Sequence, residues 1–317
     1  MKCKICGNEN NIKPFILKEM MYGLRDEFEY FRCSACDCIQ IAHIPENMDK
    51  YYPSDYYSYN TNDELLKVDL FRSYQCRSII GATKSLLGRL LTYNYKYPSY
   101  YNYLKELKLY NRRSRVLDVG SGTGELLKDF YKVGYKDLTG IDPYIEQEIT
   151  YNKHFRILKK SLFDIDDTYD SIMMHHSLEH MDKQHKVMKK LYSLLSKTGT
   201  MLIRIPIFSK PLMDQYGTNV VSLDPPRHFF IHSIKSISLL LNQNGFRIDK
   251  VDFDAHEFSF WASEQYQKNG SLHNNSESFL VKKIFSDYEI EEFKKQIKHL
   301  NDAGESDNVA LYVSKRL

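Results

Sequence analysis

The sequence predicts an α/β fold with a doubly wound, mostly parallel sheet, preceded by a small cysteine-rich segment and connecting helices. Three observations support this prediction. Strand-like and helix-like segments alternate from residue 115 onward, glycines cluster where the first of these strands ends, and five of the six cysteines lie within the first 38 residues. Alternating strands and helices are typical of a parallel sheet that is covered on both faces. A chain of 317 residues is long enough for one principal core with one or two appendages.

The composition is that of a folded protein without a strong overall charge. Hydrophobic residues make up 42% of the chain, and 44 basic against 41 acidic residues give a net charge of +3. This small excess does not favour binding to nucleic acid or to an anionic membrane. No apolar run approaches the roughly 20 residues needed to span a bilayer, and the first residues lack the apolar core of a signal peptide. We therefore expect a cytoplasmic protein.

The N-terminal cysteines have the spacing of a metal site. Cys3 and Cys6 form one CxxC pair, and Cys33 and Cys36 form a second. Each pair presents two thiolates to one ion, and four thiolates make a tetrahedral zinc site with no open position. The sequence therefore predicts a structural zinc ion. Cys38 is expected to be a spare thiol, although a register in which it replaces Cys36 stays open.

We expect three parts along the chain. A zinc ribbon is predicted over residues 1–48, a Tyr-rich loop with connecting helices over 49–110, and the main domain over 111–317. The Tyr-rich segment 51–59 is too irregular for a helix or an alternating strand. Its aromatic side chains either pack the ribbon against the main domain or line a substrate pocket, for which Tyr56 is the candidate.

The other elements follow from hydrophobic periodicity. Apolar residues recur at helical spacing over residues 64–91 and 99–109, which predicts helices leading into the main domain. Later elements are expected in this order: an amphipathic helix around residues 187–195, a strand over 200–205, a helix over 233–244, a strand over 246–253, an inserted helix near 285–303 and a last strand over 308–314.

A glycine-rich turn after the first strand of the main domain is the strongest signal in the chain. Gly120, Gly122 and Gly124 follow Asp118 in the order D-x-G-x-G-x-G. This spacing differs from the G-x-G-x-x-G of dinucleotide-binding turns, and there is no Walker lysine. Asp142 ends the next predicted strand, where a carboxylate can accept hydrogen bonds from both hydroxyls of a ribose. The pattern predicts a site for a nucleoside cofactor.

Together these residues resemble the class I S-adenosylmethionine-dependent methyltransferases, which have a Rossmann-like fold. The resemblance implies that S-adenosylmethionine is the cofactor and that Asp142 holds its ribose. Ser161 and Leu162 lie where that family has its adenine-contacting turn, and His176 follows the fourth strand, close to the cofactor or the acceptor. The methionine part of the cofactor would be held by Asp118, Gly120, Ser121, Gly122 and Gly124.

The combination of two CxxC pairs, the Tyr-rich segment and this core looks like the zinc-ribbon methyltransferases of bacterial sugar, surface-glycan and antibiotic pathways. The sugar C-methyltransferases of that kind have a further C-terminal domain and a His-Glu-His cluster in the second half, and neither is evident here. The corresponding segment 224–229 reads DPPRHF. A hydroxyl or another heteroatom on a small-molecule acceptor, such as a nucleotide sugar or a glycan, is therefore the expected target.

Three histidines are candidates for a general base. Methyl transfer from a sulfonium is an in-line displacement, so the protein positions the nucleophile and removes its proton. His176, His180 and His228 all follow strands at the edge where α/β sheets bind ligands. For His180 a structural role at the start of the next helix is the main alternative. Beside His228, Arg227 either binds a phosphate or carboxylate of the acceptor or forms a surface ion pair.

Three other functions compete with this interpretation. A zinc ribbon also suits a methyltransferase acting on RNA, but six basic residues of the ribbon are offset by six acidic ones, which leaves no basic stripe. A binding protein with an inactive methyltransferase fold would not need the intact glycine turn and Asp142. A dehydrogenase would have the other glycine spacing.

Overall fold

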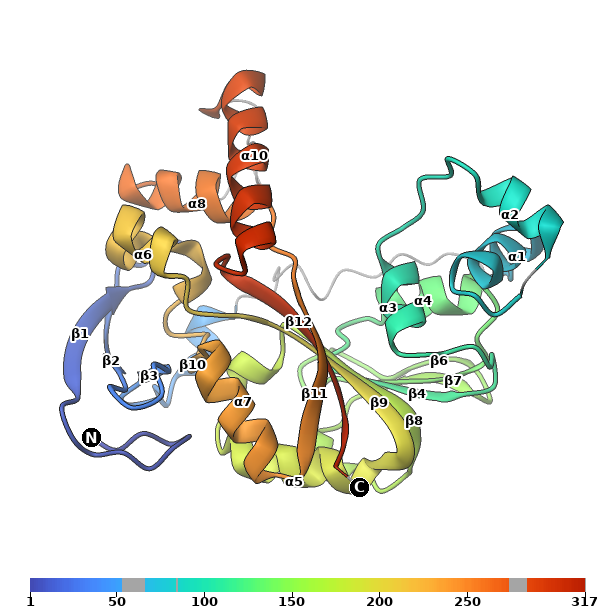
Figure 1. Cartoon of the computed structure of the whole chain (residues 1–317). Helices are drawn as coiled ribbons and strands as arrows, with labels where there is room; N and C mark the ends of the chain where they lie inside the picture. The colour runs from blue at the N-terminus through green and yellow to red at the C-terminus, as the bar shows by residue number, and fades with distance from the viewer. Residues whose placement is uncertain (53–65, 84, 274–283, 317) are drawn as a thin grey trace.

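The computed structural model describes residues 1–52, 66–83, 85–273 and 284–316, which form two β-sheets surrounded by helices (Figure 1). Most of the Tyr-rich segment, including the candidate substrate residue Tyr56, lies outside the described residues. Within the described part of the chain, no helix has the length and apolar character needed to cross a membrane.

An eight-stranded sheet forms the centre of the main domain, in the order β11-β12-β9-β8-β4-β5-β7-β6. Its strands are β4 (Arg115–Val119), β5 (Asp137–Ile141), β6 (Ile149–Asn152), β7 (Phe155–Leu158), β8 (Tyr169–His175), β9 (Leu195–Pro206), β11 (Phe246–Phe253) and β12 (Asn308–Lys315). The five central strands, β7, β5, β4, β8 and β9, pair in parallel. Strand β12 is antiparallel to both of its neighbours, and the edge strand β6 is antiparallel to β7. The predicted α/β fold with a mostly parallel sheet is confirmed.

Helices cover both faces of this sheet. Consecutive residues of a strand point to opposite faces, so each face has its own apolar core. Leu117 and Ile172 belong to one apolar core, which they share with helices α5 (Gln184–Leu194) and α7 (Ile234–Gln243). Val116 and Met173 belong to the core on the other face. The helices on that second face are α1 (Leu70–Ile79), α3 (Tyr100–Glu106) and α4 (Glu125–Lys132).

The predicted helix over residues 64–91 is two helices, α1 and α2 (Leu86–Thr92). Gly81, with φ of +82°, lies just beyond the end of α1, where a left-handed residue ends a helix. Ser85 then starts α2 as its N-cap, since its hydroxyl accepts a hydrogen bond from the backbone N–H of Gly88. The local capping residues therefore interrupt an apolar pattern that runs through both helices.

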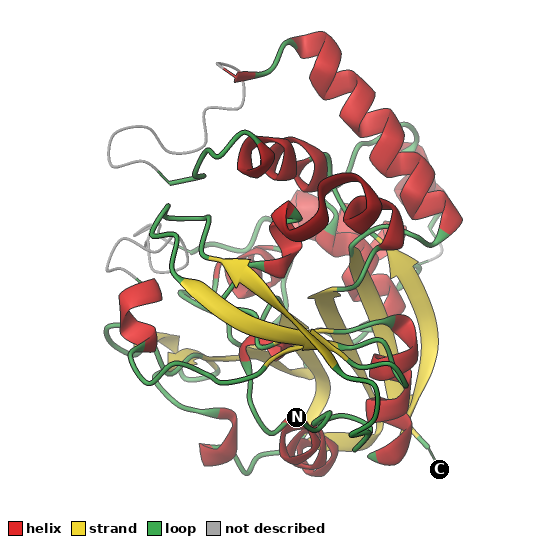
Figure 2. Cartoon of the chain, turned by 90° about the vertical axis from the view of Figure 1, so that its left-hand side faces the viewer, coloured by secondary structure: helices red, strands yellow, loops and turns green. Residues whose placement is uncertain are grey.

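The N-terminal residues form a second, smaller sheet that is completed by the main domain. Its strands are β1 (Lys13–Lys18), β2 (Glu27–Arg32), β3 (Ile39–Ile41) and β10 (Phe230–Ile231). All of them pair antiparallel, and β10 comes from the main domain, with Phe230 opposite Gln40 and Ile231 opposite Ile39. In Figure 2 this small sheet faces the viewer. The ribbon is therefore joined to the main domain by backbone hydrogen bonds.

Three helices from two insertions pack near the small sheet at the upper left of Figure 1. They are α6 (Lys210–Tyr216), α8 (Phe258–Gln267) and α10 (Asp287–Ala303). Leu17 and Tyr30 of the ribbon share one apolar core with Leu212 of α6 and Phe260 of α8. Helix α10 lies where the inserted helix is predicted, and Ser286 begins it with a capping box. Helices α6 and α8 are additional to the prediction.

Candidate active site

The turn after β4 uses three glycines in a backbone conformation that other residues rarely adopt. Gly120, Gly122 and Gly124 have φ of +76°, +51° and +81°. A Cβ at Gly124 would lie 2.4 Å from a neighbouring side chain. The backbone N–H groups of Gly120 and Ser121 both donate to the carbonyl of Ile141, at 2.8 and 3.1 Å. These bonds hold the glycine turn against the end of β5.

Two buried carboxylates flank this turn. Asp142, at the end of β5, accepts hydrogen bonds from the backbone N–H groups of Gly122 at 3.0 Å and Tyr144 at 2.9 Å. Asp118 is 4% exposed, and its Oδ1 has no hydrogen-bond partner among the described residues. Burial, assisted by the nearby charge of Asp142, raises the pKa of Asp118 to about 7. A buried carboxylate oxygen without a donor is costly, so this position suits a ligand that supplies one.

The turn after β7 lies beside the end of β5. Ser161 donates from its backbone N–H and its hydroxyl to the carboxylate of Asp164, at 2.9 and 2.7 Å, and so begins a short 3-10 turn. Leu162 is 4% exposed. Because β4, β5 and β7 are parallel neighbours, this turn and the glycine turn lie at the same edge of the sheet. The edge where parallel strands end is the usual place for a nucleotide-like ligand.

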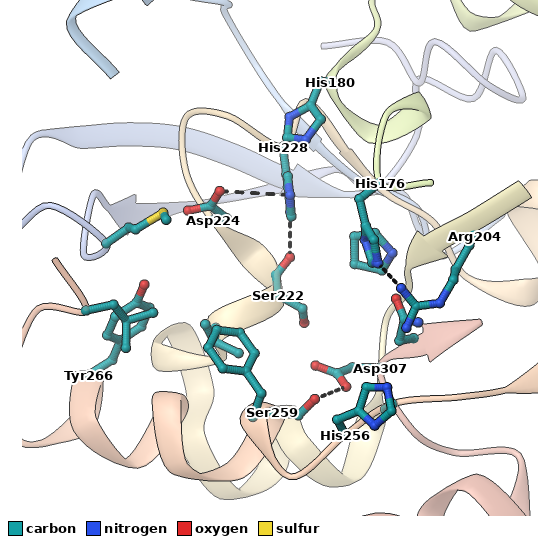
Figure 3. A pocket seen from close by; sticks show the side chains of 17 residues that line it. His176, His180, Arg204, Ser222, Asp224, His228, His256, Ser259, Tyr266 and Asp307 are labelled. Carbon is teal, nitrogen blue, oxygen red and sulfur yellow. Dashed lines mark hydrogen bonds and ion pairs between the residues drawn. The ribbon is translucent and has the colours of Figure 1, made fainter. Parts of the chain in front are cut away.

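A pocket of about 530 Å³ lies beyond the ends of β8 and β9 (Figure 3). Phe258 and Tyr266 of α8 form part of its wall, and Met21 lines it from the ribbon. Its polar lining residues are His176, His180, Arg204, Ser222, Asp224, His228, His256, Ser259, Asp307 and Asn308. The structure therefore brings all three predicted histidines to one cavity.

His228 is fixed with one ring nitrogen free. Its Nδ1 lies 2.8 Å from the carbonyl oxygen of Ser222, and because a carbonyl can only accept, Nδ1 carries the proton. Its Nε2 then has a lone pair and lies 3.9 Å from Oδ2 of Asp224, too far for a hydrogen bond. Burial lowers the pKa of His228 to about 4. The ring is therefore neutral at pH 7 and can accept a proton.

His180 has the same arrangement. Its Nδ1 is 2.8 Å from the carbonyl oxygen of Arg227 and 3.3 Å from the hydroxyl of Tyr52. Its ring lies edge-on to that of His228, with the centroids 4.8 Å apart. The preceding residue, Glu179, is fully buried, and neither oxygen of its carboxylate has a hydrogen bond within the described chain. His180 therefore belongs to a cluster of ionisable groups rather than serving only to start a helix.

His176 has neighbours at both ring nitrogens. Its Nδ1 is 3.4 Å from Oε1 of Glu179, and its Nε2 contacts the guanidinium of Arg204. Arg204 is itself paired with Asp254. Both ring nitrogens of His176 therefore have neighbours, unlike those of His180 and His228. This suits a role in positioning other groups better than the role of a base.

The position of Arg227 contradicts the prediction that it contacts an acceptor. Its side chain is 0% exposed. The guanidinium donates to both oxygens of Asp224, to Oε1 of Glu19 at 2.9 Å and to the carbonyl of Tyr51 at 3.3 Å. The surface ion pair that was the alternative is also wrong, because this network is buried. Arg227 instead links the ribbon to the loop that carries His228.

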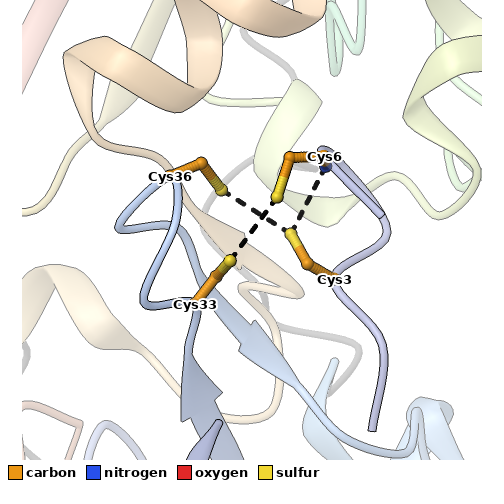
Figure 4. Close-up of side chains that lie close together, drawn as sticks. All are labelled: Cys3, Cys6, Cys33 and Cys36. Carbon is orange, nitrogen blue, oxygen red and sulfur yellow. Dashed lines mark hydrogen bonds between the residues drawn. The ribbon is translucent and has the colours of Figure 1, made fainter. Parts of the chain in front are cut away.

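The four predicted cysteines meet at one point of the ribbon (Figure 4). Sγ of Cys3 is 3.6 Å from Sγ of Cys36, and Sγ of Cys6 is 3.5 Å from Sγ of Cys33. Four sulfurs around a zinc ion with bonds of about 2.3 Å would be separated by roughly 3.8 Å, so the donor set and its spacing fit that ion. Cys38 lies outside this group, with its Sγ 3.9 Å from Nδ1 of the buried His232.

Several residues of the pocket were missed by the sequence reasoning. Arg204 ends a parallel strand at the ligand-binding edge, so its position alone could have identified it. Ser222 lies in a short 3-10 turn and Asp307 lies just before β12, and hydrophobic periodicity carries no signal for either position.

A family model described as a methyltransferase domain matches residues 93–251, which is half of the chain. The chain therefore belongs to this methyltransferase-domain family. The match includes the glycine turn, Asp142 and the three candidate histidines, His176, His180 and His228. A search of curated proteins found no match.

Methyltransferases are among the similar solved structures. One is an S-adenosylmethionine-dependent methyltransferase from Archaeoglobus fulgidus, with 21% identity, coverage of 68% of this chain and 91% of that one, and a TM-score of 0.42. Another is the 1,6-didemethyltoxoflavin-N1-methyltransferase of Burkholderia thailandensis, with 13% identity, coverage of 65% and 72%, and a TM-score of 0.38. A third comes from Listeria monocytogenes, with 14% identity, coverage of 68% and 98%, and a TM-score of 0.42. The substrates in these names belong to those proteins.

Replacing Arg227 with methionine is expected to destabilise the protein strongly. The change keeps most of the side-chain volume but leaves the carboxylates of Asp224 and Glu19 without their buried partner, which costs about 3–5 kcal/mol. Urea unfolding measures this loss. The control is Arg247→Met, which removes an exposed arginine paired with Asp249 and should change stability by less than about 0.5 kcal/mol. Unchanged stability of Arg227→Met with a raised KM for the acceptor would instead support the role predicted from the sequence.

Proposed function

We propose that this protein is an S-adenosylmethionine-dependent methyltransferase that modifies a hydroxyl, or another heteroatom, of a small molecule. The observation that carries the proposal is the pairing of the glycine turn, with its unpartnered buried Asp118, and the histidine-lined pocket at one edge of the sheet. The cofactor's methionine amino group would donate to Asp118. Its ribose hydroxyls would donate to Asp142, and its adenine would lie at Ser161 and Leu162.

The pocket favours a neutral acceptor group. Arg204 is the one arginine or lysine among the described residues that line it, and Asp254 already balances that charge. A sugar ring or a similar hydroxylated ring fits a cavity of about 530 Å³ with hydroxyl and carboxyl groups at Ser222, Ser259 and Asp307. We therefore propose a sugar, glycan or antibiotic precursor as the acceptor. If it is a nucleotide sugar, its phosphates would lie outside this pocket.

The ribbon does not favour RNA as the acceptor. In the described structure Lys18 is paired with Glu27, and Arg32 is paired with Asp37. The N-terminal lysines, Lys2 and Lys4, also form ion pairs. A surface that binds RNA needs cations that are available to phosphates.

For the chemical step, we propose that His228 removes the proton of the acceptor as the methyl group is transferred. Its Nδ1–H donates to the backbone carbonyl of Ser222, which fixes the ring and leaves the lone pair of Nε2 free, on the side of Asp224 at the pocket wall. The acceptor oxygen would attack the methyl carbon in line with the departing sulfur, while its proton goes to Nε2. His180 and His176 would position the acceptor and His228.

The first test combines a screen with one substitution. Sugars, nucleotide sugars and related hydroxylated compounds are screened for conversion of the cofactor to S-adenosylhomocysteine. With the acceptor found, His228→Ala should lower kcat by at least about 100-fold, because a positioned general base contributes that much. The affinity for S-adenosylhomocysteine should stay within about twofold. His154→Ala, an exposed histidine between β6 and β7, should keep full turnover. Unchanged kcat in His228→Ala would remove it from the mechanism.

Cofactor affinity should depend on the ionisation of Asp118. Since the pKa of Asp118 is about 7 in the free protein, lowering the pH protonates the carboxylate that receives the cofactor's ammonium group. Binding of S-adenosylhomocysteine should therefore strengthen roughly tenfold from pH 6 to pH 7.5. Isothermal titration calorimetry measures this change.

Two variants test this dependence on Asp118. Asp118→Asn should bind weakly and with little dependence on pH. Asp167→Asn, whose side chain is 65% exposed in the wild type, should behave as the wild type does. Absence of cofactor binding at every pH would overturn the proposed function itself.

We also propose that Cys3, Cys6, Cys33 and Cys36 hold one structural zinc ion. Cys36→Ser should lose the zinc, because three thiolates bind it far less tightly, and the ribbon should lose its folding energy with it. Cys38→Ser is the matched control and should retain one zinc per chain. Metal analysis of the purified variants distinguishes the two registers, and the opposite result would show that Cys38 is the ligand.

A further inference from the structure

A fully buried carboxylate, that of Glu179, lies beside the histidines that line the pocket. Glu179 is 0% exposed, and neither of its side-chain oxygens has a hydrogen bond within the described chain. Nδ1 of His176 lies 3.4 Å from its Oε1. A buried carboxylate with so little compensation is costly. The position therefore favours a cation.

Two imidazoles beside Glu179 have their lone pairs available. Nδ1 of His180 is 2.8 Å from the carbonyl of Arg227, and Nδ1 of His228 is 2.8 Å from the carbonyl of Ser222. Both protons are therefore on Nδ1, and both Nε2 atoms can bind a ligand. A backbone carbonyl that accepts from the opposite ring nitrogen is the arrangement that orients metal-binding histidines.

The three side chains are close enough to share one ion. One ligand atom from each of Glu179, His180 and His228 lies within 4.8 Å of the others. A tetrahedral ion with bonds of about 2.1 Å separates its donors by about 3.4 Å, so small side-chain rotations close the site. Asp224 is also close, but its carboxylate is paired with Arg227. The charge that needs compensation is therefore that of Glu179.

We propose that Glu179, His180 and His228 form a binding site for a divalent transition-metal ion such as zinc or cobalt. Two imidazoles and a carboxylate suit these ions better than magnesium or calcium, which prefer oxygen ligands. Three protein ligands leave at least one coordination position for water or an acceptor oxygen, and both His180 and His228 line the pocket. This site is separate from the four-cysteine cluster of the ribbon.

The metal site shares a pocket with the proposed methyl transfer. Metal binding itself does not depend on the proposed function, and only the expected effect of the metal on turnover rests on that function. Nε2 of His228 cannot hold a metal ion and accept a proton at the same time. Occupancy of the site should therefore block the base and inhibit methyl transfer, with no loss of affinity for S-adenosylhomocysteine. Binding of the metal is measurable without any acceptor.

The test titrates cobalt(II) into untagged protein that already carries one zinc per chain in its cysteines. One further equivalent of cobalt should bind and give visible d–d absorption without the charge-transfer bands of thiolate ligands. Glu179→Gln and His180→Asn should each weaken this binding by at least about 100-fold, since even residues behind the ligands contribute 10- to 100-fold. The variants should bind S-adenosylhomocysteine normally, which shows that they fold.

His256→Ala is the matched control for metal binding, because His256 lines the same pocket outside the cluster. It should bind cobalt as the wild type does. No further equivalent of cobalt in the wild type, equal binding in Glu179→Gln, or a loss of binding in His256→Ala would overturn the metal site. Cobalt binding that raises turnover would leave the site in place and would instead overturn His228 as the base.

Discussion

The buried guanidinium of Arg227 is the interaction on which the arrangement of the pocket depends. Its nitrogens hold Glu19 of the ribbon, the carbonyl of Tyr51 and the carboxylate of Asp224. The backbone carbonyl of Arg227 accepts a hydrogen bond from Nδ1 of His180. One residue therefore connects the ribbon, the chain that leaves it and the histidine cluster. Because a buried arginine is stable only with its partners in place, these segments must assemble together.

Through this network the ribbon helps to form the pocket, although the two are far apart in the sequence. The hydroxyl of Tyr30 donates to the backbone carbonyl of His228 at 2.9 Å. Strand β3 pairs with β10, two residues beyond His228, and Met21 lines the pocket itself. The ribbon thus holds the loop of His228 from one side while the main sheet holds His176 and His180 from the other. Its contribution is to position groups in the pocket.

The sequence predicts those features that depend on local chemistry. The glycine turn requires glycine because of its backbone angles, and the cysteine pairs are spaced to meet at one ion, so both are visible without a structure. Many strands and helices of the main domain follow from periodicity, including α10 and β12. The interrupted helix at Gly81 was missed because its apolar pattern continues across the break.

The role of Arg227 could not be predicted, because its partners are distant in the sequence. Glu19 is 208 residues away, and no local pattern reveals such a pairing. The same reason hides β10, a two-residue strand that exists only because β3 offers an edge. Helices α6 and α8 are short, and they are stabilised by packing near the ribbon rather than by a long amphipathic pattern.

The coupling between ribbon and pocket gives the four-cysteine site a consequence beyond its own segment. A domain as small as the ribbon gains much of its folding energy from a bound metal. If the ribbon loosened, Glu19 would leave Arg227, and the guanidinium would keep only Asp224 and a carbonyl in a site closed to water. That charge would then favour a rearranged loop, which would move the carbonyls that hold His180 and His228. Metal binding by the thiolates would thus affect the histidines through the fold of the ribbon and the buried hydrogen bonds of Arg227.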